Sequence, residues 1–194
     1  MKEIILATHN KHKLEEFTKM LAPLGYEVLG LNDLNQEIEI IENGTTFQEN
    51  ALIKVRSVFE ALHIPVISDD SGITCDCLDG GPGVYSARFM GEDTPYTIKN
   101  NYLIEKANET GKRGCAYVCV IAYKDEAGNE QTFEGIVEGE IHSCEAGSNG
   151  FGYDPIFYYA PLQATWAQVS MEEKNKVSHR ARALAQFLAY LKGE

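Results

Sequence analysis

The sequence predicts an α/β fold with a mixed β-sheet flanked by helices, and three observations support this prediction. Strand and helix patterns alternate in the N-terminal part, which is typical of parallel β-α-β units. Two long strand patterns then surround the short turn 125–130, which predicts an antiparallel hairpin. With 194 residues, 44% of them hydrophobic, the chain is long enough for one large domain with a substantial core. A cleft between a helix-rich and a strand-rich lobe is a natural expectation for such a chain.

The N-terminal part is predicted to contain three strands and two helices. A continuous apolar run predicts a buried first strand over 2–8. Thr46 and Glu49 form a T-x-x-E capping box, so a helix is predicted over 45–63, with an apolar stripe on one side. The other elements expected here are a helix over 9–26, a short strand over 27–31, a polar loop over 32–44 and a strand over 64–69.

The segment "SDDSG", residues 68–72, follows the end of the buried strand over 64–69, and its Asp, Ser and Gly residues suit a turn as well as a ligand site. Ser178 is a candidate N-cap for the last helix. The elements expected after this segment are a half-buried strand over 72–78, a glycine-rich loop over 79–93, a helix over 96–109, hairpin strands over 115–124 and 131–142, a glycine-rich loop over 146–157 leading to a short strand, and one or two helices over 170–194.

Charge and cysteine usage limit the possible partners and compartment. The formal net charge of −12 argues against non-specific binding to nucleic acid or to an anionic membrane, but it does not exclude a small polyphosphate. The five cysteines show no C-x-x-C spacing and are an odd number, which indicates reduced thiols. No apolar run approaches the ~20 residues of a membrane span, nor does the N-terminus read as a signal peptide. The sequence therefore predicts a soluble, cytoplasmic protein.

Two motifs are candidates for binding phosphate and a cation. The residues at the first strand-to-helix junction are Thr8, His9, Asn10, Lys11, His12 and Lys13. A helix N-terminus offers unpaired N–H groups to a phosphate, although an ordinary N-cap with solvated lysines also fits this motif. Asp69 and Asp70, with Glu42 upstream, offer the carboxylate oxygens that Mg²⁺ prefers, although "DDSG" is equally a turn.

Two further motifs are candidates for binding a flat base. "GFGYDP" places Phe151, Gly152, Tyr153 and Asp154 in one loop, where glycine allows close backbone approach and the aromatic rings can contact a base. The alternative is a turn with buried aromatic residues. "EKNKVSHR" places Lys174, His179 and Arg180 at a helix start, where they suit a phosphate or a base carbonyl. A capped, solvated helix is the alternative. Together the four motifs describe a Mg²⁺-dependent nucleotide site.

In this order the motifs resemble the inosine triphosphate pyrophosphatase family, which includes the dITP/XTP pyrophosphatases. The blocks are "THNKHK", "FQENALIK", "DDSG", "LDGGPGVYSARF", "GFGYDP" and "EKNKVSHR", and the resemblance runs from about Ile4 to Leu191. It implies Mg²⁺-dependent hydrolysis of ITP, dITP and XTP to the monophosphate and pyrophosphate by a homodimer. The fold that it implies is an elongated mixed sheet flanked by helices, in two lobes with a central active-site cleft.

The resemblance also implies roles for individual residues. Thr8, Asn10 and Lys13 correspond to a phosphate loop, and Glu42 and Asp70 to metal ligands, with Asp70 also the general base and Asp69 an alternative ligand. The residues that it assigns to the substrate's phosphates are Lys54, Ser71 and Arg88, and those that it assigns to the base and sugar are Phe151, Gly152, Tyr153, Asp154, Lys174, His179 and Arg180. His9 stands where the family often has glycine, which leaves the role of this one residue open.

Three alternatives to this function are considered. A phosphorylation-dependent receiver also uses an acidic pair, a threonine and a lysine, but its acidic pair follows the first strand, where this chain has "THNKHK". A nucleotide-binding module without catalysis would not need two metal carboxylates. A pyrophosphatase for other modified nucleotides, such as modified pyrimidines, is the nearest rival.

Overall fold

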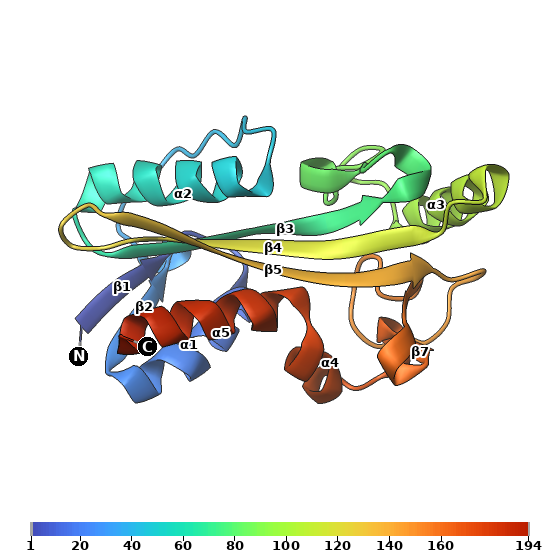
Figure 1. Ribbon diagram of the computed structural model, residues 1–194. Helices are drawn as coiled ribbons and strands as arrows, with labels where there is room; N and C mark the ends of the chain where they lie inside the picture. The colour runs from blue at the N-terminus through green and yellow to red at the C-terminus, as the bar shows by residue number, and fades with distance from the viewer. Residues whose placement is uncertain (1, 194) are drawn as a thin grey trace. The chain divides into compact units, whose positions relative to one another are not determined.

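A seven-stranded mixed sheet organises the computed structural model, which describes residues 2–193 (Figure 1). Its strand order is β2-β1-β3-β4-β5-β6-β7. The strands are β1 Lys2–Leu6, β2 Tyr26–Gly30, β3 Val66–Cys75, β4 Gly114–Lys124, β5 Glu130–Ile141, β6 Phe157–Tyr159 and β7 Ala164–Thr165. β1 pairs in parallel with β2 and β3, whereas β6 pairs antiparallel with β5 and β7. The predicted α/β fold with a mixed sheet is therefore confirmed.

The longer helices begin and end close to the predicted positions. They are α1 Lys11–Leu21, α2 Phe47–Leu62, α3 Tyr96–Thr110, α4 Met171–Val177 and α5 His179–Lys192. Thr46 and Ser178 are confirmed as N-caps, because each side-chain oxygen accepts a hydrogen bond from the third residue of its helix. Pro23 and Gly25 close the first helix, as the sequence predicts: a 3-10 turn that contains Pro23 follows α1, and Gly25 at φ 83° ends that turn.

The chain forms two compact units. The first runs to Asp70 and includes Val120–Phe133, and the second comprises Ser71–Cys119 and the residues from Glu134 onward. In the first unit α1 and α2 lie on opposite faces of the sheet (Figure 1). Its core includes Ile4, Ile5, Leu6, Phe17, Leu21, Val55, Val58, Val66 and Ile67. The core of the second includes Ile73, Leu103, Ile104, Ala107, Tyr117, Val137, Phe157 and Trp166.

The two strands predicted over 64–69 and 72–78 are one strand, because β3 continues through residues 68–72 to Cys75, and the alternative of a turn there is wrong. Gly72 is needed for packing instead: a Cβ there would lie 2.4 Å from Ser86 Oγ and 2.6 Å from the carbonyl oxygen of Gly83. Ser86 Oγ also accepts a hydrogen bond from the N–H of Ile73 at 2.9 Å. The glycine therefore allows a loop to approach the strand closely, which sequence reasoning interpreted as a turn signal.

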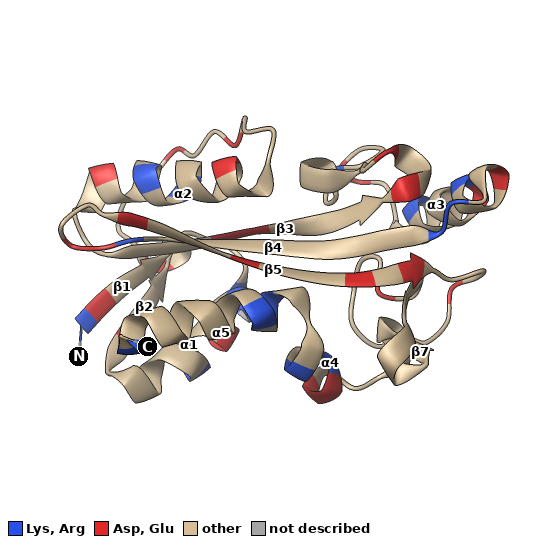
Figure 2. Cartoon of the chain, viewed as in Figure 1, with Lys and Arg blue, Asp and Glu red and all other residues tan. Residues whose placement is uncertain are grey.

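Acidic residues, coloured red, occur at several places along the strands of the sheet (Figure 2). On β5 the exposed positions include Glu134, Glu138 and Glu140, which alternate with the buried Phe133 and Val137. All five cysteines are free thiols, as the sequence predicts. Within residues 2–193 no helix combines the length and the apolar character that crossing a membrane requires.

Glu130 in the first unit provides a testable link between pH and stability. Its carboxylate lies 2.7 Å from Arg56 Nη2 and 2.7 Å from Lys124 Nζ. Hydrogen bonds from Arg56 lower the pKa of Glu130 from 4.5 to about 2. A depressed folded-state pKa stabilises the protein above the unfolded value, and the contribution disappears as pH falls from 4.5 through about 2.

We therefore expect Glu130→Gln to lower the free energy of unfolding by about 1 kcal/mol at pH 7. Urea unfolding of both proteins between pH 7 and pH 2 measures this difference, which should shrink steadily below pH 4.5. A difference that is independent of pH would show that the ion pairs do not carry it.

Candidate functional site

Asp69 and Asp70 lie in the middle of β3 and face two different lysines. Successive strand residues point to opposite faces, so adjacent carboxylates separate. Asp69 is 2% exposed, and its Oδ1 accepts from Lys13 Nζ of α1 at 2.8 Å. Asp70 faces α2, where Lys54 Nζ is 3.5 Å from its Oδ1 and Asn50 Nδ2 donates to its Oδ2 at 3.2 Å. This pairing with lysines makes two adjacent charges tolerable in a largely buried strand.

Lys54 is the centre of an acidic cluster in the first unit. Its ammonium lies 2.8 Å from Glu42 Oε2 and donates to the backbone carbonyl of Asp69 at 3.0 Å. Burial lowers the pKa of Lys54, but the charges of Asp70, Asp69 and Glu42 outweigh it and raise the pKa overall. Burial raises the pKa of Asp70, and Lys54 and Asn50 offset this only in part. Lys54 therefore stays charged while the Asp70 carboxylate is a stronger base than in water.

The predicted metal ligands fit a divalent cation in their chemistry. Among residues 2–193 no three His, Cys, Asp or Glu side chains gather closely enough to hold a metal ion by themselves. Glu42 and Asp70 nevertheless both lie within 3.5 Å of one positively charged atom, Lys54 Nζ. Mg²⁺ is commonly held by one or two carboxylates together with substrate phosphates, so two hard oxygen donors are a sufficient protein contribution. Asp69 is bound to Lys13, apart from this pair.

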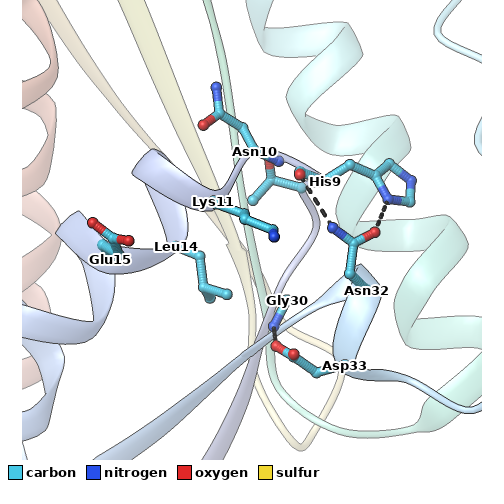
Figure 3. Close-up of a pocket in the computed structure, with 9 residues that line it drawn as sticks. His9, Asn10, Lys11, Leu14, Glu15, Gly30, Asn32 and Asp33 are labelled. Atoms are coloured by element: carbon cyan, nitrogen blue, oxygen red, sulfur yellow. Dashed lines mark hydrogen bonds between the residues drawn. The ribbon is translucent and has the colours of Figure 1, made fainter.

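The loop between β1 and α1 is a capped helix start. Asn10 Oδ1 accepts from the N–H of Lys13 at 3.3 Å, and Thr8 Oγ1 accepts from the N–H of Asn10 at 3.2 Å. A pocket of about 250 Å³ adjoins this loop. The residues that line the pocket are Thr8, His9, Asn10, Lys11, Leu14, Glu15, Gly30, Asn32 and Asp33 (Figure 3). The helix N-terminus and Lys13 therefore lie together, as predicted, while the side chain of His12 lies outside the described residues.

His9 fixes this loop to the short 3-10 helix Leu31–Asp33. Asn32 Nδ2 donates to the carbonyl oxygen of His9 at 3.2 Å, and the His9 ring Nδ1 lies 2.8 Å from Asn32 Oδ1 (Figure 3). Because the amide donates through nitrogen, its oxygen accepts, and the histidine ring is the donor in the second bond. The N–H of Leu31 also donates to the carbonyl oxygen of Thr8 at 3.2 Å. His9 thus holds the loop between β1 and α1 against the 3-10 helix Leu31–Asp33.

In the second unit Asp154 is the centre of the predicted base cluster. It is 1% exposed, and its Oδ2 accepts from Lys174 Nζ at 2.5 Å and from the N–H of Phe151 at 3.0 Å. Gly150 lies at φ +71°, and a Cβ there would meet Asp154 Oδ2 at 2.1 Å. Only glycine therefore allows the loop to fold back onto this carboxylate. Lys174 and Asp154, 20 residues apart, form a buried ion pair.

The aromatic residues of the loop divide into one exposed and one buried ring. Phe151 is 66% exposed, and Lys174 Nζ lies 5.2 Å from the centre of its ring. Tyr153 is 3% exposed, and its hydroxyl donates to the carbonyl oxygen of Ser86 at 2.6 Å. Burial raises the pKa of Tyr153, so this hydroxyl remains a donor. Phe151 is therefore available to a ligand, while Tyr153 fixes the loop in place.

The first turn of α5 carries the other predicted base residues. His179 is 5% exposed, and Arg180 Nη2 lies 3.5 Å from Ser71 Oγ. Arg88, which the resemblance assigns to the substrate's phosphates, lies on an exposed turn, with its guanidinium 5.3 Å from the centre of the Tyr85 ring.

Several residues that contact the cluster around Lys54 or the predicted base cluster around Asp154 were not predicted as site residues from the sequence. Asn50 donates to Asp70, and Asn100 Nδ2 donates to the carbonyl oxygen of Gly152 at 3.3 Å. The ring of Tyr117 stacks on His179. Asn50 lies within the "FQENALIK" block, in which the sequence predicts no role for this residue, whereas Asn100 and Tyr117 lie in elements that carried no functional motif.

Gly135 of β5 allows α5 to approach the sheet. A Cβ at this position would lie 2.0 Å from the carbonyl oxygen of His179 and 2.6 Å from the backbone nitrogen of Ala183. Both contacts are with backbone atoms, which cannot rotate away. We therefore expect Gly135→Ala to destabilise the protein by about 1–3 kcal/mol. Thermal unfolding measures this loss. Ile136→Ala is the control, because the neighbouring side chain is 40% exposed and its loss should change the melting temperature little. Equal effects of both changes would contradict the close-approach argument.

The first unit offers carboxylates and ammonium groups that suit a divalent cation and phosphates, and the second offers an exposed aromatic ring beside a lysine that suits a flat base. The sequence profile of the Ham1 family matches residues 4–190, and the chain therefore belongs to this family. The resemblance inferred from the sequence motifs is thereby confirmed.

Curated relatives and solved structures are similar over nearly the whole chain. The dITP/XTP pyrophosphatase of Staphylococcus aureus (strain Mu50 / ATCC 700699) is 41% identical over 194 residues, which cover 100% of this chain and 98% of the relative. The dITP/XTP pyrophosphatase of Leptospira interrogans is 44% identical over 193 residues and 98% of each chain. The structure of the Staphylococcus aureus Ham1 protein matches with a TM-score of 0.93 and 40% identity over 99% of each chain.

Proposed function

We propose that this protein hydrolyses non-standard purine nucleoside triphosphates, namely ITP, dITP and XTP, to the nucleoside monophosphate and pyrophosphate. The observation that carries the proposal is the cluster around Lys54, in which an ammonium and two carboxylates suit a triphosphate and a divalent cation. Family membership and the dITP/XTP pyrophosphatase relatives support it. In the cell, this activity removes such nucleotides from the pool.

Asp70 is the proposed general base. Burial raises the pKa of its carboxyl, which strengthens it as a proton acceptor for a water that attacks the α-phosphorus. Lys54 and Lys13 supply positive charge for the triphosphate, together with the N-terminus of α1. Glu42 and Asp70 are the residues that would hold Mg²⁺, which when bound neutralises charge that develops on the phosphates. Pyrophosphate is then the leaving group.

The cluster around Asp154 in the second unit, called the second cluster from here on, is proposed to bind the base of the nucleotide. Inosine and xanthine carry a carbonyl at the 6-position, which can accept a hydrogen bond from His179 or Arg180. Adenine presents an amino donor there, so a pocket lined with donors leaves it unpaired, which disfavours ATP. Phe151, being exposed, offers its ring face to the purine. Within the second unit, Ser71 Oγ lies 3.5 Å from Arg180 Nη2.

Product analysis tests the chemistry. Incubation with ITP and Mg²⁺, followed by ³¹P NMR, should show pyrophosphate and IMP, with no orthophosphate in the early time points. Addition of EDTA should stop the reaction. Release of orthophosphate and IDP would place the attack at the γ-phosphorus and refute the proposed reaction.

We also propose that the enzyme is a cytoplasmic homodimer. Five free thiols fit a reducing compartment. The segment 85–98 exposes Tyr85, Met90, Tyr96 and Ile98, whose side chains are 37–54% exposed, and apolar surface of this kind is typical of protein interfaces. Light scattering on the purified protein should give twice the monomer mass of 21.6 kDa. A single monomer peak at micromolar concentration would refute the dimer.

A further inference from the structure

Tyr117 of β4 contacts the two groups proposed to read the base. Its hydroxyl donates to Asp154 Oδ1 at 3.3 Å. Its ring is stacked on that of His179, with 4.8 Å between ring centres and 16° between planes. The ring of Trp166 is stacked on Tyr117 in the same way, at 4.8 Å and 11°. All four residues belong to the second unit, and Tyr117 and Trp166 lie outside every motif singled out in the sequence.

We propose that Tyr117 is a positioning residue for base selection, which sets the orientations of Asp154 and His179 together. This inference rests on the proposed function, because it assumes that the second cluster binds a purine. Tyr117 is 8% exposed and is not proposed to touch the substrate. It acts through the two residues that it holds.

The hydroxyl contact restricts rotation of the Asp154 carboxylate. Lys174 and the N–H of Phe151 hold one oxygen, and Tyr117 holds the other. A carboxylate fixed at both oxygens keeps Lys174 at a fixed place beside Phe151. Burial, together with the nearby Asp154 charge, raises the pKa of Tyr117 well above 10, so the hydroxyl is a donor throughout the working pH range.

The ring contact restricts His179 independently of the hydroxyl. His179 is the first residue of α5, and the Ser178 cap fixes the start of this helix. The flat faces of Tyr117 and Trp166, nearly parallel to the imidazole, leave it little freedom to tilt. The two contacts can therefore be removed separately: Tyr117→Phe removes the hydroxyl alone, and Tyr117→Leu removes both.

Trp166 allows base binding to be measured without turnover, because it is the only tryptophan in the chain and is stacked on both Tyr117 and His179. We would titrate each protein with IMP and follow tryptophan emission. We would also measure kcat and KM for ITP and ATP, and the melting temperature. Tyr159→Phe is the matched control, since Tyr159 is a 9% exposed tyrosine of the same unit whose hydroxyl accepts from Arg182.

For Tyr117→Phe we expect the ratio of kcat/KM for ITP over ATP to fall about tenfold, with kcat for ITP within about twofold of wild type. Tyr117→Leu should lower the ratio further and weaken IMP binding about tenfold or more. Tyr159→Phe should change neither quantity. If both Tyr117 variants lower the melting temperature but keep the ratio and the IMP affinity, the residue only packs the core and the positioning proposal is wrong. If the wild-type protein neither releases pyrophosphate from ITP nor binds IMP, the proposed function itself fails, and the positioning proposal fails with it.

Discussion

Asp70→Asn is expected to lower kcat for ITP by about a thousandfold or more, because it removes the general base and one of two cation ligands. Asparagine has nearly the same shape, its one side-chain oxygen can accept from Asn50, and Glu42 and the carbonyl oxygen of Asp69 still hold Lys54. The loss would therefore reflect chemistry rather than a missing contact. Steady-state pyrophosphate release at saturating ITP and Mg²⁺ measures it. Asp79→Asn is the control: Asp79 is an exposed carboxylate paired with Lys112, and its replacement should leave kcat unchanged.

The same variant should remain folded. Burial raises the pKa of Asp70, so the ionised carboxylate is disfavoured in the folded protein relative to the unfolded chain. A raised folded-state pKa in an acid means that stability decreases as pH rises through it, and a neutral asparagine relieves this penalty. The melting temperature of Asp70→Asn at pH 7 should therefore equal or exceed that of wild type. A variant with near wild-type turnover, or one that is unfolded, would contradict the assigned role.

Lys174→Met is expected to destabilise the protein by about 3–5 kcal/mol, the usual effect of leaving a buried charge without its partner. Asp154 is 1% exposed, and Lys174 lies 2.5 Å from its Oδ2. Without the ammonium, the carboxylate retains only Tyr117 and the N–H of Phe151 as donors. Urea unfolding at pH 7 measures the loss.

A double-mutant cycle distinguishes the ion pair from simple packing. Lys174→Met combined with Asp154→Asn should recover stability relative to Lys174→Met alone, because no buried charge is then unpaired. Lys176→Met removes a lysine of the same helix that is exposed and paired with Glu172, and it should have no measurable effect. Additive losses in the double variant would show that Lys174 and Asp154 do not act as a pair.

Local chemistry made most helices predictable. The capping oxygens of Thr46 and Ser178 contact residues three positions along the chain, so the sequence nearby contains all of the necessary information. β3 shows the opposite case. "DDSG" has the composition of a turn, yet the strand continues because Lys13, Lys54 and the loop around Ser86 compensate its polar residues from far away in the chain. Such compensation depends on tertiary contacts, and a local pattern cannot reveal it.

The candidate site was predictable as a set of motifs but not as an arrangement. The sequence motif assigns Asp69 and Asp70 to the same cation site. In the structure, successive residues of β3 point to opposite faces, so Asp69 pairs with Lys13 and Asp70 lies near Lys54. The role that the resemblance gives to Arg88 stays a prediction, because Arg88 lies on an exposed turn over Tyr85, in the other unit from Lys54. Tyr117 carried no signal at all, because a tyrosine in an apolar strand is indistinguishable from ordinary core until its partners are known.

The measurement that tests the central claim most directly is pyrophosphate release from ITP, dITP, XTP, ATP and GTP, with and without Mg²⁺. We predict rapid release from the first three that depends on Mg²⁺, and little release from ATP, while GTP, which carries the same 6-carbonyl, tests whether the site also reads the 2-position of the purine. Release from all five would support the cluster around Lys54 but contradict the role given to His179 and Arg180. No release from any of the five would contradict the proposed function.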